Sequence, residues 1–179
     1  GTQDGRCAMK KMLIVMFAIV GLSAAFTASA VDLDETVPDF TLKAMDGSNM
    51  RLEELRGQVV LINFWASWCG PCRQEMPILQ KIHDRYESMG FTVLGVNVDE
   101  KQDKARRIVE RLKVNFPLLL DTDQYVSEAF DVNAMPFSVL VGRDGKINYI
   151  HRGYKPGDEN LYVNRLKALL RAQNNGVAD

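Results

Sequence analysis

The sequence predicts an α/β domain in which a mixed central sheet carries helices on both faces. Residues 59–64 form a continuous apolar run, which is typical of a central strand that is covered on both faces. The stretch after residue 72 has apolar residues at three- and four-residue spacing, which indicates an amphipathic helix. Strands and helices then alternate until a final hairpin and helix, and this order favours a mixed sheet.

The first elements form a small hairpin ahead of the central strand. Residues 38–42 alternate between polar and apolar and predict a short strand, and residues 49–51 predict the returning strand. Asp46-Gly47 between them is a strong signal for a hairpin turn. Residues 52–55 predict a single helical turn that ends at Gly57.

The later elements follow from hydrophobic periodicity and turn residues. The predicted order is a helix over 72–89 that ends at Gly90, a strand over 91–98, a helix over 101–112, a strand over 116–120, a short helix over 126–130, a strand over 137–141, a hairpin through Asp144-Gly145 to 146–151, and a helix over 158–172. The expected core residues of the last helix are Leu161, Val163, Leu166, Leu169 and Leu170.

The amino-terminal 30 residues predict an export signal. Translation is expected to start at Met9, with residues 1–8 upstream of it; Lys10 and Lys11 form a basic end and residues 12–22 an apolar core. Ala28-Ser29-Ala30 is a small-residue cleavage site, so we expect residues 31–179 to be the mature domain. The alternative is an uncleaved amino-terminal anchor, because residues 12–30 carry no charge.

Charge and cysteine content narrow the function of residues 31–179. This segment has 19 basic and 22 acidic residues, a net charge of −3, whereas nucleic-acid binding favours a basic face. Its only cysteines are Cys69 and Cys72. Exported proteins usually use cysteines in structural disulfides, but a loop of four residues constrains the unfolded chain very little. A redox role therefore explains the pair better than a structural one.

The segment Trp68-Cys69-Gly70-Pro71-Cys72 lies where the central strand passes into a helix. There the free N–H groups and the dipole of the helix favour the thiolate of Cys69, which is the attacking species. Cys72, one turn further in, can then resolve the mixed disulfide. Pro71 suits the first helical turn, where a missing N–H costs nothing.

Residues 64–72 resemble the active-site segment of thioredoxins, and more narrowly that of the exported TlpA/ResA/CcmG group of thiol–disulfide oxidoreductases. Further similarities are Pro38-Asp39-Phe40 with residues 52–57, Glu75, the insert over 97–130 with Asp121-Thr122-Asp123, and Met135-Pro136, which stands where the family has a cis-proline. The resemblance covers about residues 36–174. It implies a thioredoxin-like three-layer fold with an amino-terminal β-hairpin extension.

The resemblance also implies roles for single residues. Cys69, Cys72 and Glu75 would be catalytic, and the substrate would be bound by Trp68, Gly70, Pro71, Met135 and Pro136. Asn63 departs from the buried Asp that cytoplasmic thioredoxins use in proton transfer, so Glu75 is the candidate for that role and Glu100 a second one. The alternatives are a solvated first-turn Glu75 and a Pro136 that merely starts a strand.

The function expected from the residues and the resemblance is reduction of disulfides in exported proteins, in the periplasm or at the outward face of the cytoplasmic membrane. Substrates would include apocytochrome c, and a DsbD/CcdA-like membrane protein would supply electrons. We expect a monomer with no metal and no cofactor other than the Cys69–Cys72 disulfide. The alternatives are a protein disulfide oxidase and a copper-binding metallochaperone that uses the same thiols. The two histidines, His83 and His151, lack zinc-site spacing, and His83 is expected to pack in the core.

Overall fold

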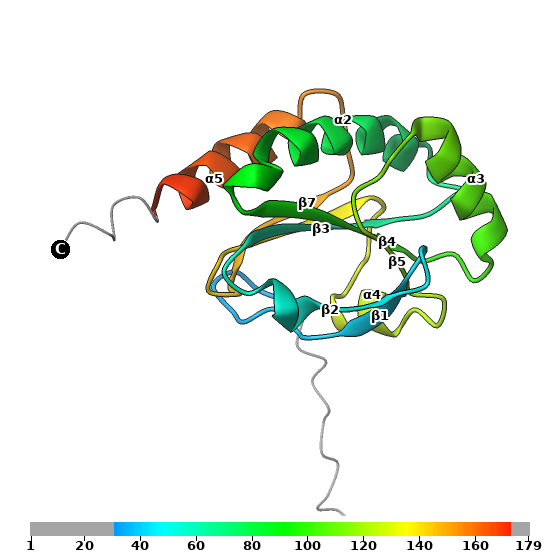
Figure 1. Cartoon of the computed structure of the whole chain (residues 1–179), viewed down its shortest axis with the longest axis horizontal. Coiled ribbons are helices and arrows are strands. Elements are labelled where there is room, and N and C mark those ends of the chain that lie inside the picture. The colour runs from blue at the N-terminus through cyan, green and yellow to red at the C-terminus, as the bar shows by residue number, and fades with distance from the viewer. Residues whose placement is uncertain (1–30, 173–179) are drawn as a thin grey trace, which may run out of the picture.

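The computed structural model describes residues 31–172, and Figure 1 shows how they are arranged. The expected export signal and cleavage site at residues 9–30 lie outside the described residues. No helix within residues 31–172 combines the length and the apolar character that crossing a membrane would need.

Seven strands of the described chain form one mixed sheet in the order β2-β1-β5-β4-β3-β6-β7. Strands β3, β4 and β5 are parallel, and the other pairings are antiparallel. The strands are β1 (Thr41–Ala44), β2 (Asn49–Arg51), β3 (Val59–Trp65), β4 (Phe91–Asn97), β5 (Leu118–Leu120), β6 (Phe137–Val141) and β7 (Ile147–Arg152). The mixed sheet and the amino-terminal hairpin β1–β2 are as the sequence predicts.

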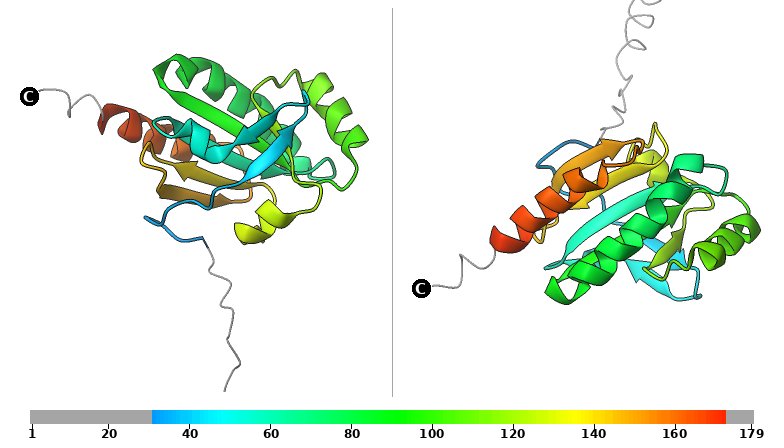
Figure 2. Two further views of the ribbon diagram at one scale, coloured as in Figure 1. Left: turned by 60° about the horizontal axis from the view of Figure 1, so that its bottom comes forward. Right: turned by 90° about the horizontal axis from the view of Figure 1, so that it is seen from above.

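Helices cover both faces of this sheet. In the view from above, α5 (Glu159–Ala172), α2 (Gly70–Tyr86) and α3 (Gln102–Leu112) lie side by side over one face (Figure 2). The short helix α4 (Tyr125–Ala129) lies on the other side (Figure 1). Two 3-10 turns, η1 (Leu52–Leu55) and η2 (Glu87–Met89), complete the elements. Helix α2 therefore has α5 on one flank and α3 on the other.

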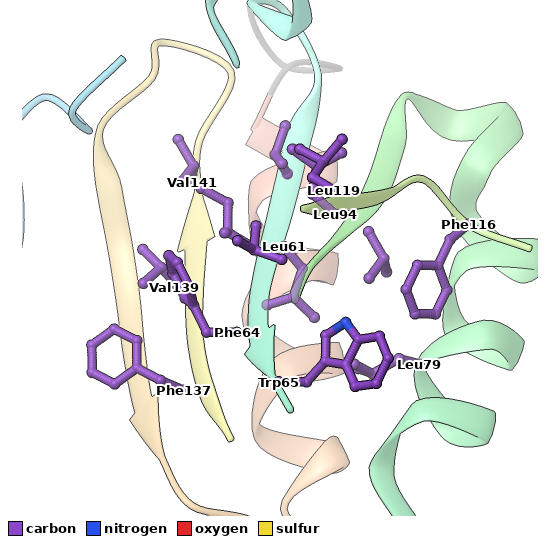
Figure 3. Close-up of a cluster of buried hydrophobic side chains, with 14 of the residues drawn as sticks. Leu61, Phe64, Trp65, Leu79, Leu94, Phe116, Leu119, Phe137, Val139 and Val141 are labelled. Atoms are coloured by element: carbon purple, nitrogen blue, oxygen red, sulfur yellow. The ribbon is translucent and has the colours of Figure 1, made fainter. Parts of the chain in front are cut away.

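Strand β3 lies in the middle of the core, and all seven of its residues are buried. Figure 3 shows Leu61, Phe64 and Trp65 of β3 among side chains from β6, β4 and α2. The neighbours labelled there are Leu79, Leu94, Phe116, Leu119, Phe137, Val139 and Val141, and all are buried. A strand with no exposed face confirms the interpretation of the apolar run as a central strand. This packing fixes the end of β3, from which the Cys69 segment leaves the sheet.

Three differences from the expected structure concern the site and the core, and the element ends otherwise lie within two residues of the expected ones. Strand β1 starts at Thr41 rather than at residue 38, and ahead of it the Asp39 carboxylate accepts hydrogen bonds from Arg51 Nε and from the Glu53 N–H. Helix α2 starts at Gly70 rather than at Cys72, because Cys69 itself is its N-cap. Its extension η2 ends at Gly90, as predicted, with a left-handed φ of 81° that suits glycine.

The third difference concerns the core face of α5. Leu161 is 45% exposed, so its prediction as a core residue was wrong. Tyr162 is buried instead, and Leu166 and Leu170 follow it at intervals of four residues. Val163 and Leu169 are partly buried and pack at the edge of the core.

Candidate active site

Cys69 and Cys72 form a disulfide at the amino-terminal end of α2, with an S–S distance of 2.03 Å. Cys69 is the N-cap of the helix, and its Sγ accepts a hydrogen bond from the Cys72 backbone N–H at 3.1 Å. Pro71 occupies the first turn, where its missing N–H leaves no bond unmade. The contact and the helix dipole both favour negative charge on the Cys69 sulfur once the disulfide is reduced.

Cys69 is the more exposed of the two cysteines. Cys69 is 4% exposed and Cys72 is 0% exposed, while the neighbouring Trp68 is 69% exposed. Trp68 therefore places a large apolar side chain in solvent directly next to Cys69 in the chain. Trp65, by contrast, is fully buried and belongs to the core.

The Trp68 segment is held in place by a buried aspartate that the sequence analysis missed. Asp99, just after β4, accepts hydrogen bonds from the Ser67 backbone N–H at 2.8 Å and from Ser67 Oγ at 3.0 Å. Asn97 Nδ2 donates to the same carboxylate at 2.8 Å. Because these contacts cross between neighbouring strand ends, they fix the approach to Cys69. No local sequence signal marks Asp99, since the pairing spans 32 residues.

Glu75 is fully buried, so the alternative of a solvated first-turn glutamate is wrong. Its Oε1 accepts a hydrogen bond from Tyr162 Oη at 2.7 Å, and its Oε2 accepts one from Asn63 Nδ2 at 2.9 Å. Burial raises the pKa of Glu75 to about 7, against the lowering effect of these two hydrogen bonds. A helical spacing of three residues places Glu75 next to Cys72 on the helix surface. The site therefore pairs a disulfide with a carboxyl group that titrates near neutral pH.

Asn63, Ser138 and Tyr162 complete a buried polar cluster around this carboxyl group. Asn63 Nδ2 also donates to Ser138 Oγ at 2.9 Å, and burial beside Glu75 raises the pKa of Tyr162. Ser138 and Tyr162 were missed in the sequence analysis, because they come from β6 and α5, far along the chain. The signal for Tyr162 was its alignment with Leu166 and Leu170 at four-residue spacing.

The Met135–Pro136 peptide bond is cis, as the resemblance implied. Pro136 is buried, and its carbonyl accepts a hydrogen bond from the Gly153 N–H at 2.8 Å. Met135 is partly buried, and its own N–H and C=O have no backbone partner among the described residues. Strand β6 itself is interior to the sheet, between β3 and β7.

Three other residues named from the sequence are Glu100, His83 and His151. Glu100 is exposed and lines a hollow of about 530 Å³ that also contains Trp68, Ser67 and Asp99. His83 is buried, and its Nδ1 accepts a hydrogen bond from the Val93 N–H, which confirms its packing role. His151 contacts Asp158. Within residues 31–172, no three side chains of His, Cys, Asp or Glu are grouped to ligate a metal ion.

Comparison with known proteins gives the family. The sequence model of the Redoxin family matches residues 33–170. The thiol-disulfide oxidoreductase ResA of Geobacillus thermodenitrificans is 34% identical over 146 residues, which is 79% of this chain and 84% of that protein. ResA of Bacillus subtilis is 31% identical over 140 residues, or 76% of this chain and 78% of that protein.

Solved structures agree with this assignment. The crystal structure of a Chlorobium tepidum protein described as a thiol:disulfide interchange protein DsbE has a TM-score of 0.76 and 33% identity, and the match covers 79% of this chain and 99% of that one. A Bacteroides thetaiotaomicron protein described as a protein disulfide isomerase has a TM-score of 0.73 and 32% identity, over 79% of this chain and 91% of that one. The chain therefore belongs to the redoxin family, as a thioredoxin-fold thiol–disulfide oxidoreductase of the TlpA/ResA/CcmG-like group.

Proposed function

We propose that this oxidoreductase acts as a reductant of disulfides in exported proteins, in the periplasm or at the outward face of the cytoplasmic membrane. The observation that carries the proposal is the Cys69–Cys72 disulfide at the start of α2, with the buried Glu75 carboxyl one turn further on. The export signal expected at residues 9–30 supports the location. The Gly70-Pro71 pair between the cysteines supports the reducing direction, because it resembles the reducing members of the group.

The reaction starts from the reduced enzyme. The Cys69 thiolate attacks one sulfur of the substrate disulfide, the substrate S–S bond breaks, and the released substrate thiolate takes up a proton. Cys72 then loses its proton and attacks the Cys69 sulfur, which breaks the mixed disulfide and frees the second substrate thiol. The substrate gains two electrons and two protons, and the enzyme ends with the Cys69–Cys72 disulfide.

Glu75 is proposed to take the proton that Cys72 must lose. Cys72 is fully buried, so water reaches its thiol poorly, and a carboxylate one turn away is the nearest acceptor that helical geometry provides. A pKa of about 7 leaves a large share of Glu75 ionised at neutral pH, while its protonated form remains easy to reach. A thiol on Cys72 and a carboxyl group on Glu75, one helical turn apart, would titrate as a coupled pair.

The substrate is proposed to lie between the exposed Trp68 and the free peptide groups of Met135. Trp68, Gly70 and Pro71 would form its apolar contact, and Met135 would pair with an extended substrate segment next to the cis-Pro136. Apocytochrome c is one substrate that the resemblance suggests. A membrane donor of the DsbD/CcdA type would return two electrons to the disulfide after each cycle.

The cysteine assignment is tested with single variants. Cys69→Ser is expected to abolish insulin reduction, because Cys72 is fully buried, and Cys72→Ser is expected to accumulate a mixed disulfide through Cys69. Intact-mass measurement after incubation with a disulfide peptide detects that adduct. An adduct on Cys72 rather than on Cys69, in the matched variants, would contradict the assigned order.

The role of Glu75 is tested by the pH dependence of thiol alkylation. Rates are measured on the reduced wild type and on Glu75→Gln, with iodoacetamide as the probe. The curve of the variant is expected to lose the inflection near pH 7 that the carboxyl group contributes. Superimposable curves would remove Glu75 from the mechanism.

Direction is tested by the reduction potential of the Cys69–Cys72 pair, measured in defined thiol–disulfide buffers. A reductant needs a potential below that of its substrates, and a tenfold change in the equilibrium corresponds to about 30 mV. A potential near that of strong protein oxidants would favour the oxidase alternative. Cell fractionation with amino-terminal sequencing of the recovered protein tests the location and the cleavage after Ala30.

A further inference from the structure

A groove of about 320 Å³ lies between α3 and the start of α2 and is lined by positive side chains. Lys104, Arg107 and Arg111 of α3 stand at spacings of three and four residues, which puts them on one face of that helix. Arg73 of α2 faces them across the groove, and all four cations are exposed. We call this feature the basic groove; Ser67 and Ile108 complete its lining.

The basic groove adjoins the disulfide segment directly. Arg73 follows Cys72 in the sequence, and its Nη1 donates a hydrogen bond to the Ser67 carbonyl at 2.8 Å. Its Nη2 lies 4.0 Å from the position that a β-carbon on Gly70 would take. The guanidinium group is therefore fixed against the loop that carries Trp68 and Cys69. A ligand in the groove would touch the same loop as a substrate disulfide.

The positive charges of the groove have no ion-pair partner within residues 31–172. No ion pair within 4.0 Å involves Arg73, Lys104, Arg107 or Arg111 among the residues that the structure describes. Asp103 and Glu110 stand at neighbouring helical positions to Arg107, yet neither is paired with it. The domain as a whole has a net charge of −3, so the groove opposes the overall sign. Its cations are free to meet a negative ligand.

The geometry points to the basic groove as the docking site for an acidic segment of the substrate protein, close in sequence or space to the disulfide that is reduced. This inference builds on the proposed function and specifies its substrate class. Charge complementarity across such a surface raises the rate and selectivity of encounter. A protein segment is favoured over a lipid surface, because a bilayer on this loop would also cover Trp68 and Cys69.

Binding is tested first without any redox chemistry. The probe is a fluorescent, cysteine-free peptide rich in Asp and Glu, and its reference replaces these residues with Asn and Gln; anisotropy is read at low salt and at 1 M salt. The acidic peptide should bind the oxidised wild type at least about 10-fold more tightly than the reference, with the difference lost at 1 M salt, where the Debye length falls to about 3 Å.

Matched charge reversals locate the binding. Arg107→Glu with Arg111→Glu should remove the preference for the acidic peptide, while Lys167→Glu with Arg171→Glu on α5 makes the same change in net charge and should keep it. Circular dichroism checks that both variants fold, and Arg107→Gln with Arg111→Gln is the milder substitute. Equal loss in the two reversals, or an unchanged preference in the groove variant, would overturn the proposal.

Two further probes separate other sources of negative charge. Inorganic phosphate that binds at the groove without any peptide preference would indicate a small-anion site and overturn the docking of a protein segment. Vesicles containing phosphatidylglycerol test a lipid surface. If they sediment the wild type but not the Arg107→Glu, Arg111→Glu variant, and no peptide preference is seen, the groove binds lipid and the docking of a protein segment is overturned.

Turnover then connects the groove to reduction. Two cyclic disulfide peptides, one with acidic and one with neutral flanks, are reduced by the wild type and the two reversal variants. The ratio of kcat/KM for the acidic to the neutral peptide should fall at least about 10-fold in the groove variant and stay constant in the α5 variant. If the wild type reduces neither peptide, the proposed function fails, while the cysteine-free peptide still decides whether the groove binds acidic segments.

Discussion

The two flanks of helix α2 differ in whether their ionisable side chains are buried or exposed. On the flank toward α5, Glu75 is enclosed with Asn63, Ser138 and Tyr162, and each of these side chains is at most 2% exposed. On the flank toward α3, Arg73 and the other cations of the basic groove are exposed. Both flanks adjoin the same active-site segment.

The difference shows how burial decides what a charge can do. A group without water responds strongly to a single hydrogen bond or neighbour, so the α5 flank can adjust a pKa. An exposed charge contributes roughly 0 to 1 kcal/mol to stability and acts mainly on partners that arrive from solution. We therefore expect substitutions on the α5 flank to change stability and its pH dependence, and substitutions on the α3 flank to change binding.

The largest effect is expected from Asn63→Asp. The change replaces the Nδ2 donor that faces Glu75 Oε2 at 2.9 Å with a second carboxylate. Two buried carboxylates at that distance cannot both be ionised, so we expect a loss of roughly 4 kcal/mol at pH 8 and less at pH 4. Urea unfolding of the oxidised protein measures it, with the exposed Asn160→Asp as the control. A similar loss at both pH values would contradict the charge-based explanation.

Glu75→Gln should change the slope of stability with pH. The pKa of Glu75 rises from 4.5 in the unfolded chain to about 7 in the folded one, so below pH 4.5 the carboxyl group is protonated in both states and adds no pH-dependent cost. Between pH 4.5 and 7 the folded state holds the extra proton, and the wild type should lose roughly 3 kcal/mol as the pH rises. Glu75→Gln should lack that loss. The oxidised protein is used because its cysteines do not titrate.

Tyr162→Phe should have a moderate effect with a defined sign. The hydroxyl group donates to Glu75 Oε1 at 2.7 Å and stabilises the ionised form, so its removal should raise the pKa of Glu75 further. We expect a loss of about 1 to 2 kcal/mol at pH 8 and a pH-dependent region that extends to higher pH. Tyr149→Phe is the matched control, since that hydroxyl contacts His151 instead. If both variants show the same pH profile, Tyr162 does not position the carboxyl group.

The smallest effect is expected on the α3 flank. Arg107→Gln removes an exposed charge that has no ion pair among the described residues, so the free energy of unfolding should change by less than about 0.5 kcal/mol. Urea unfolding at low and high salt measures it. A loss above about 1 kcal/mol would show that Arg107 supports the fold and would remove the contrast between the two flanks.

The sequence predicted the features that depend on local order. The apolar run of β3, the strand-to-helix position of Cys69 and the αL end at Gly90 all follow from neighbouring residues. The contact from the Cys72 N–H to the Cys69 sulfur follows from helix geometry as well. The start of α2 was set two residues too late, because a cysteine is an unusual N-cap.

The features that were missed depend on long-range contacts. Tyr162 reaches Glu75 across 87 residues, and Asp99 reaches Ser67 across 32. No periodicity reports such a pairing, and the burial of Glu75 became visible only when α5 and β6 were in place. The error at Leu161 has the same origin, since α5 turns Tyr162 rather than Leu161 toward the sheet.

The hydrogen bond from the Cys72 N–H to Cys69 Sγ means that the sulfur atom has two roles. The sulfur that exchanges partners during turnover is also the atom that finishes the helix. A sulfur keeps its lone pairs whether it is bonded to Cys72, to a foreign sulfur or to neither. The helix can therefore remain capped by the Cys69 sulfur throughout the catalytic cycle, and no other residue is needed to accept this N–H.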